Sequence, residues 1–166
     1  MVRRGRFGLR LATVLLMGSL ALTACSSTDE GTTVTVTHGE VPAPTLVDNG
    51  VPGNSVGDTR LFRFDGTDEE GEVVHTDWVM TTTALDVAPD GFESRVATGV
   101  FAFGDVSNQL ILEGAAYYPA AGATLKPSAS TIRSIIGGSG TYAGATGWVK
   151  STHLDDGTWT HVFHIQ

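Results

Sequence analysis

The stretch IIGGSGTYAGATGWV, residues 135–149, contains five glycines and two alanines among aromatic and β-branched residues. It is too short and too apolar for a flexible linker, and strand-like runs flank it on both sides. Glycine adopts positive φ without strain and leaves room for close backbone contact, so this composition is typical of a tight, packed turn. The stretch therefore predicts a turn between two β-strands, and the sequence around it decides the fold.

Short runs rich in β-branched and aromatic residues occupy the chain from residue 59 to residue 166. Seven such runs are separated by turn-forming residues: TRLFRFD, EVVHTDWVMTTTALDV, SRVATGVFAF, NQLILEGAAYY, STIRSIIGG, YAGATGWVKSTHL and GTWTHVFHIQ. This spacing, without a helical period, is typical of an all-β sandwich or barrel. An eighth strand is expected inside residues 73–88, if that run splits, or before residue 58. We expect an all-β fold, an antiparallel eight-stranded barrel, because closing the sheet removes its exposed edges.

Two ordered motifs resemble the allene oxide cyclase family and the related dirigent proteins. In that family a Gly-Asp turn precedes a Leu-x-Val-Gln-Gly strand, and a later apolar strand ends in Gly-Gly-x-Gly, an aromatic, a small residue and Gly-Ala-x-Gly. The matching positions are Gly104–Asp105, Leu110–Gly114, Gly137–Gly138, Gly140, Tyr142, Gly144–Ala145 and Gly147. The resemblance covers residues 59–166. It implies a barrel with a mostly apolar cavity, often in homotrimers, with no metal and no organic cofactor.

The five glycines of the opening stretch are expected to be structural. Gly137, Gly138 and Gly140 are expected to adopt positive φ in a tight connection. Gly144 and Gly147 are expected where backbones approach each other or the sheet bends sharply. The motif therefore predicts a corner of the barrel and carries no chemistry of its own.

The beginning of the chain resembles a bacterial lipoprotein signal. Four arginines precede an apolar run of about a dozen residues, which is too short to span a bilayer, and then the sequence LTAC. By this resemblance residues 1–24 are a signal peptide, and Cys25 carries the lipid that anchors an exported protein to the membrane of the cell envelope. Residues 25–58 are expected to form a flexible Pro/Gly/Thr-rich tether. Within them TTVTVTH alternates and is equally compatible with a strand or a solvated tether.

Charge and cysteine content exclude two features. The chain has 10 Lys and Arg against 18 Asp and Glu, and cleavage before Cys25 removes four of the arginines. Binding to nucleic acid requires a basic surface, so no nucleic-acid partner is expected. Cys25 is the only cysteine, which excludes an intramolecular disulfide.

A small polar set provides the candidate ligand-binding residues: Arg63, Asp65, Thr82 and Tyr118. The resemblance loosely aligns Arg63 and Asp65 with a Glu and an Asn of the cyclases, and Thr82 with a Cys. Residues two apart share one face of a strand, so Arg63 and Asp65 can pair. They are expected either to bind a carboxylate or carbonyl, with Asp65 as candidate acid or base, or to form a salt bridge at the rim. Because the cyclase Glu and Cys are missing, allene oxide cyclase activity itself is not expected.

The histidines do not predict a metal site. His161 and His164 are three apart on an expected strand, so they face opposite sides, and no second cysteine is present. We therefore expect no metal.

Three functions remain open from the sequence. The first is a binding module that holds a small apolar molecule in the barrel cavity. The second is a cofactor-independent cyclase or isomerase of the allene oxide cyclase or dirigent type. The third is a structural or interaction barrel whose interior is filled by side chains. A cavity containing Arg63 and Asp65 favours the first two functions, whereas a filled interior leaves only the third.

Overall fold

The computed structural model describes residues 31–166 except residues 88–90, 121 and 123. The strands in this part are β1 (Thr32–His38), β2 (Thr45–Val47), β3 (Thr59–Asp68), β4 (Val73–Ala84), β5 (Glu93–Phe103), β6 (Gln109–Tyr118), β7 (Ser130–Gly138), β8 (Gly147–His153) and β9 (Trp159–Ile165), with a 3₁₀ turn η1 (Gly140–Tyr142) before β8. The expected signal peptide and Cys25 lie outside the described residues. Within the described residues, no helix is long and apolar enough to cross a membrane.

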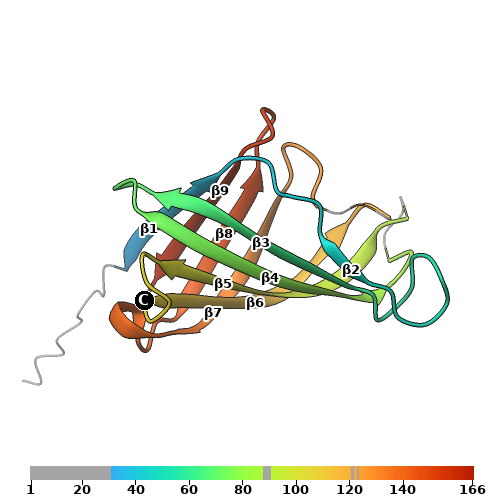
Figure 1. Ribbon diagram of the computed structural model, residues 1–166, viewed down its shortest axis with the longest axis horizontal. Helices are drawn as coiled ribbons and strands as arrows, with labels where there is room; N and C mark the ends of the chain where they lie inside the picture. Colours follow the sequence, from blue (N-terminus) through green and yellow to red (C-terminus); the bar gives the residue numbers. More distant parts are fainter. Residues whose placement is uncertain (1–30, 88–90, 121, 123) are drawn as a thin grey trace, which may run out of the picture.

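Eight of these strands close into an antiparallel barrel (Figure 1). Neighbouring strands pair in the order β1-β9-β8-β7-β6-β5-β4-β3, and β1 also pairs with β3, which closes the ring. The short strand β2 lies on β3 as an addition to the barrel. The expected all-β, eight-stranded antiparallel barrel is confirmed, and all seven strands expected from residue 59 onward are present.

The eighth strand is β1, which lies in the segment assigned above to the tether. It pairs with β9 along its whole length and with β3 at Val36 and Thr37. The alternation of TTVTVTH turns Val36 and His38 into the barrel, where both are buried. The expected start of the barrel at residue 59 is therefore wrong. The barrel starts at Thr32, because β1 supplies the pairings with β9 and β3 that close it.

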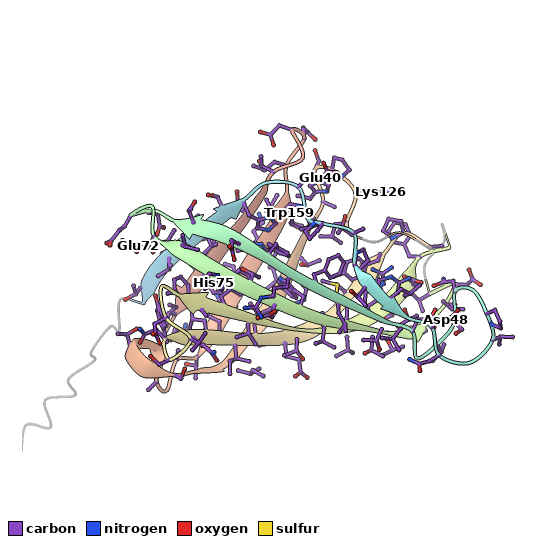
Figure 2. All side chains as sticks on the ribbon, in the orientation of Figure 1. Glu40, Asp48, Glu72, His75, Lys126 and Trp159 are labelled. Atoms are coloured by element: carbon purple, nitrogen blue, oxygen red, sulfur yellow. The ribbon has the colours of Figure 1, made fainter. Side chains whose placement is uncertain are left out.

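Alternate residues of each strand fill the interior and form the core. The buried apolar residues include Val36, Phe62, Val74, Trp78, Phe101, Leu110, Leu112, Ile135, Val149 and Phe163. Phe101 meets both Trp78 and Phe163 edge to face, with ring centroids 5.8 and 4.9 Å apart. Figure 2 shows side chains occupying much of the space enclosed by the strands. Packing within one closed sheet thus supplies the core.

The glycine-rich stretch forms the connection from β7 through η1 to β8, as expected. Gly140 has φ +59°, and a side chain there would collide with Asn108. Gly147 has φ +125° and lies against the carbonyl of His164. Gly137 and Gly138 were expected to have positive φ as well, but they do not: both belong to β7. At Gly138 the need is space, since a Cβ would lie 2.6 Å from the carbonyl oxygen of Gln109.

Candidate functional site

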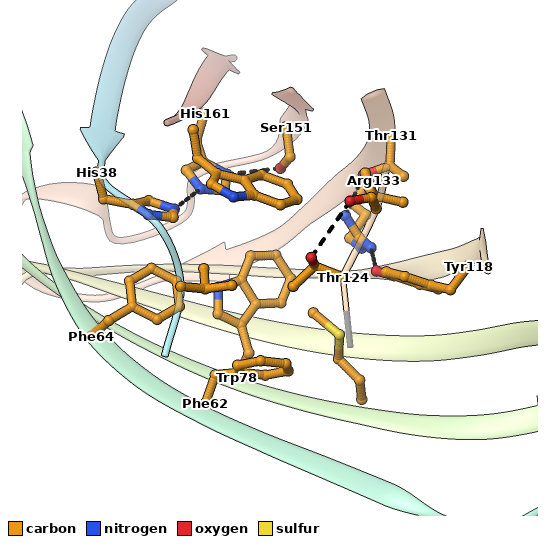
Figure 3. A pocket seen from close by; sticks show the side chains of 14 residues that line it. His38, Phe62, Phe64, Trp78, Tyr118, Thr124, Thr131, Arg133, Ser151 and His161 are labelled. Atoms are coloured by element: carbon orange, nitrogen blue, oxygen red, sulfur yellow. Dashed lines mark hydrogen bonds between the residues drawn. The ribbon is translucent and has the colours of Figure 1, made fainter. Parts of the chain in front are cut away.

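The barrel interior contains a cavity at the end where β1 finishes and β9 begins. Its volume is about 30 Å³. Figure 3 shows the side chains that converge on it: His38, Val41, Phe62, Phe64, Trp78, Met80, Tyr118, Thr124, Leu125, Thr131, Arg133, Ser151, Trp159 and His161. Mostly apolar walls with a few convergent polar groups are the usual composition of a small-molecule site.

Arg133 projects from β7 into this cavity and is only 4% exposed (Figure 3). Its Nη1 donates to Thr131 Oγ1 at 2.6 Å, and its Nη2 donates to the Tyr118 hydroxyl at 2.5 Å. The guanidinium carbon lies 5.2 Å from the centroid of the Trp78 ring. The buried Nε–H has no acceptor in the part of the chain that the structure describes. Arg133 therefore keeps one hydrogen-bond donor that no described residue satisfies.

A buried charged cluster lies beside the cavity and shares Tyr118 with it. Arg95 Nε donates to Glu93 Oε1 at 2.6 Å, and Arg60 Nη2 lies 3.4 Å from the same oxygen. The Arg95 guanidinium also lies 4.5 Å from the centroid of the Tyr118 ring. Burial lowers the pKa of Arg95, and the hydrogen bond to Glu93 opposes that shift. Tyr118 is thus in contact with both Arg95 and Arg133.

The arginines of this cluster are offset by nearby carboxylates, whereas Arg133 has no carboxylate partner among the described residues. Glu93 offsets one of the two arginines of the cluster. Asp58 lies near Arg60, and the backbone N–H groups of Ser55 and Asn49 lower the pKa of Asp58, which keeps it ionised. Among the described residues, no carboxylate forms an ion pair with Arg133. Within the part of the chain that the structure describes, Arg133 is therefore a buried cation whose partners are neutral.

Three residues on the opposite wall form a hydrogen-bonded chain whose direction can be worked out. His38 Nδ1 lies 2.6 Å from the carbonyl of Gly39, which can only accept, so His38 Nδ1 carries the proton. In neutral His38 the other nitrogen then accepts, so His161 Nε2 donates to His38 Nε2 at 2.9 Å. His161 Nδ1 is left as the acceptor for the Ser151 hydroxyl, 2.8 Å away. The chain runs from Ser151 through His161 to His38.

Both imidazoles of this chain are held neutral at pH 7. Burial lowers the pKa of His161 well below 6.5, and neighbouring His38 and Arg133 lower it further. Burial also lowers the pKa of His38, although its hydrogen bond to Gly39 opposes the shift. His161 Nδ1 is therefore a neutral base at the cavity wall.

These pKa directions predict that acid destabilises the fold. Below about pH 6.5 the unfolded histidine binds a proton that the folded His161 does not, so stability falls by up to about 1.4 kcal/mol per pH unit for this group. The loss continues until the pH reaches the lowered folded pKa. We expect the slope between pH 6.5 and pH 5 to be smaller in His161→Gln, measured as the free energy of unfolding in urea. The matched variant His164→Gln, on the outer side against Trp148, should keep the wild-type slope. An unchanged slope in His161→Gln would contradict the conclusion that burial lowers the pKa of His161.

Two of the expected ligand-binding residues lie outside the cavity. Arg63 and Asp65 alternate with the inward Phe62 and Phe64, and their side chains are 72% and 64% exposed. They do not pair with each other: Arg63 lies 3.7 Å from Asp77, and Asp65 lies 2.7 Å from His75, across the β3–β4 pair. Both occupy outward-facing positions of β3, so they do not reach the cavity in this structure, and a ligand-binding role for either stays a prediction.

The other two expected residues are buried inside the barrel. Tyr118 lines the cavity and accepts the hydrogen bond from Arg133. Thr82 accepts a hydrogen bond of 3.0 Å from Arg60 Nη1 and therefore supports the neighbouring charged cluster. A direct role for either residue in ligand binding stays a prediction.

The sequence reasoning missed the polar residues that reach the cavity. Arg133 and Ser151 were not singled out, and neither was His38, because the segment before residue 59 was assigned to the tether. A signal was present for His38, since Val34, Val36 and His38 share one phase of an alternating run. Among the described residues, no three His, Cys, Asp or Glu gather as a metal site.

Fold and site together define an antiparallel eight-stranded β-barrel with a small internal cavity, lined by a buried arginine that forms no ion pair with a described residue. No protein-family model matches the chain, and no curated protein matches it in sequence. Among solved structures, the chain is similar to a pyocyanin demethylase, with a TM-score of 0.59, 18% sequence identity, and coverage of 81% of this chain and 98% of that chain. At this identity the likeness shows the shared barrel fold.

Proposed function

We propose that the barrel binds a small, largely apolar molecule in its interior cavity. The observation that carries the proposal is the convergence of Arg133, Tyr118 and His161 on a space walled by Trp78 and Trp159. A structurally similar barrel is a demethylase named for the small molecule pyocyanin, which supports a small-molecule role for this scaffold. The aromatic wall favours a flat apolar body, and the polar groups fix its orientation.

The size of the cavity determines how this proposal is tested. A volume of about 30 Å³ holds roughly two water molecules. A larger ligand therefore requires a side chain to withdraw. Leu125 is the candidate, because it reaches the cavity from the connection between β6 and β7 and is only 6% exposed. Its backbone carbonyl accepts a hydrogen bond from His153 Nδ1 at 2.8 Å, which fixes this part of the connection.

We expect Leu125→Ala to bind a neutral aromatic probe, benzamide, at least about tenfold more tightly than the wild type, because the deleted side chain leaves space against the aromatic wall. Isothermal titration calorimetry measures the affinity, and quenching of Trp78 and Trp159 fluorescence reports the same site. Leu61→Ala is the matched control, since Leu61 is partly exposed on the outer face of β3. If neither wild type nor Leu125→Ala binds the probe at millimolar concentration, the interior is a filled, structural core and the proposal fails.

A cofactor-independent isomerase or cyclase is a second candidate, favoured by the chain from Ser151 to His38. A neutral imidazole at the wall of a mostly apolar cavity can accept a proton that a bound molecule passes to it through the Ser151 hydroxyl, and can return it by the same route. Asp65 was the expected acid or base, but its exposed outer position makes His161 the better candidate. Loss of turnover with retained binding in His161→Gln would separate this function from simple binding.

We further propose that the chain is an exported lipoprotein and a distant member of the allene oxide cyclase and dirigent group. The support for export is the arginine-rich start and the LTAC sequence ending at Cys25. The support for the group is the pair of glycine motifs together with the barrel fold. Membrane fractionation of Cys25→Ser, which lacks the lipid-bearing thiol, tests the anchoring.

A further inference from the structure

The buried guanidinium of Arg133 identifies the chemical class of the ligand. We propose that the cavity binds a small aromatic monoanion, a carboxylate, with its acidic group at Arg133. This inference rests on the proposed binding function and names the ligand class for the same site. Its starting point is charge: burying a cation away from water is unfavourable unless an anion accompanies it.

Three hydrogen-bond donors at and next to Arg133 have no acceptor in the described chain. The Arg133 Nε–H is buried without a partner among residues 31–166 apart from the undescribed 88–90, 121 and 123. The Tyr118 hydroxyl and Thr131 Oγ1 each accept a proton from Arg133, so the hydrogen of each hydroxyl remains free to donate. Among the described residues, no hydrogen bond uses either of those hydroxyl hydrogens. Three donors next to a positive charge are complementary to carboxylate oxygens.

The remaining wall determines the rest of the ligand. Trp78 lies under the guanidinium, and Phe62, Phe64 and Trp159 complete an aromatic lining. A flat aromatic ring matches this lining, since aromatic side chains favour stacked or edge contacts with other rings. On the far wall the hydroxyl hydrogen of Ser151 is already used by His161. The site is therefore polar at one side and apolar across most of its remaining surface.

The charge balance favours a monoanion over a phosphate. Among the described residues, Glu93 and Asp58 offset Arg60 and Arg95, which leaves the positive charge of Arg133 uncompensated there. A phosphate monoester, with close to two negative charges at pH 7, would bring an excess negative charge into the interior. The protein as a whole is acidic, with 18 Asp and Glu against 10 Lys and Arg. The overall charge of the protein repels anions, so the attraction for an anionic ligand must come from Arg133 and the donors next to it.

The test compares benzoate with its neutral isostere benzamide by calorimetry at pH 7.5 and constant ionic strength, with wild type and with Leu125→Ala. We expect benzoate to bind at least about 30-fold more tightly than benzamide, because only benzoate can form a buried ion pair with Arg133. In Arg133→Gln this preference should disappear. The matched control Arg63→Gln removes an exposed arginine on the outer face and should keep the preference. Tyr118→Phe, which retains every charge, should weaken benzoate about tenfold and reduce its preference over benzamide; it provides the test if Arg133→Gln does not fold.

Each outcome separates the two proposals. Equal affinity for benzoate and benzamide overturns the carboxylate inference and leaves the binding function standing. A benzoate preference that survives in Arg133→Gln overturns the assignment to Arg133. Absence of binding by both probes, in wild type and in Leu125→Ala, overturns the binding function and this inference with it.

Discussion

A chain that starts at Thr59 is expected not to fold cooperatively. Without β1, strands β3 and β9 each lose one of their neighbours and keep only β4 and β8 respectively, so the barrel becomes an open sheet with two unpaired edges. The deletion also removes the buried side chains of Val36 and His38, so the core is exposed along one seam. The loss includes the hydrogen bond between His38 and His161. Thermal unfolding followed by circular dichroism is the measurement.

The comparison chain starts at Gly31 and retains β1. We expect it to unfold in one sharp transition, whereas the chain starting at Thr59 should show no cooperative transition and should aggregate. A sharp transition in the shorter chain, near the temperature of the longer one, would show that β1 is dispensable and that the barrel boundary lies at residue 59 after all.

Glu93→Gln is expected to lower the free energy of unfolding by about 3–5 kcal/mol, the usual cost of breaking a buried ion pair by removing one partner. Glu93 is fully buried, and its Oε1 lies between Arg60 and Arg95. Replacing the carboxylate with an amide leaves both cations buried with a much weaker acceptor between them. Urea unfolding monitored by tryptophan fluorescence gives the change.

Glu113→Gln is the matched control, because Glu113 is exposed on the outer face of β6. Its change in stability should stay within about 0.5 kcal/mol, as for most surface substitutions. If Glu93→Gln is within 1 kcal/mol of the wild type, the cluster does not depend on the ion pair, and the charge balance used to single out Arg133 no longer holds.

The strands were predictable because their patterns are local. Alternating β-branched and aromatic runs, separated by glycine and aspartate turns, gave the seven strands from residue 59 onward. The strand β1 was ambiguous for a physical reason: a seven-residue polar run has little preference until β9 and β3 supply its partners. Its position in the barrel depends on contacts distant in sequence, which composition does not reveal.

The site was less predictable because it depends on which face of each strand points inward. In β3, Phe62 and Phe64 share one phase, and this signal places Arg63 and Asp65 outside. In β7 the pattern misleads, since Ile132 and Ile136 are on the outer phase, 63% and 56% exposed, while Arg133 points inward. A charged residue inside and isoleucines outside contradict the simple rule of apolar burial. Only the closed structure shows which phase encloses the cavity.

Closure of the barrel through β1 also sets an order of events during synthesis. The chain is made from its amino end, so β1 is the first of the described strands to emerge and its partner β9 is the last of them; His38 and His161, which meet across this seam, are separated by 123 residues. The intervening strands can pair with their neighbours as they appear, but β1 must remain without its main partner until β9 is available. Pairings so distant in sequence form slowly because loop-closure entropy must be overcome first. The same seam that completes the cavity is therefore the last of the described strand pairings to form, and the cavity is incomplete until β9 has been made.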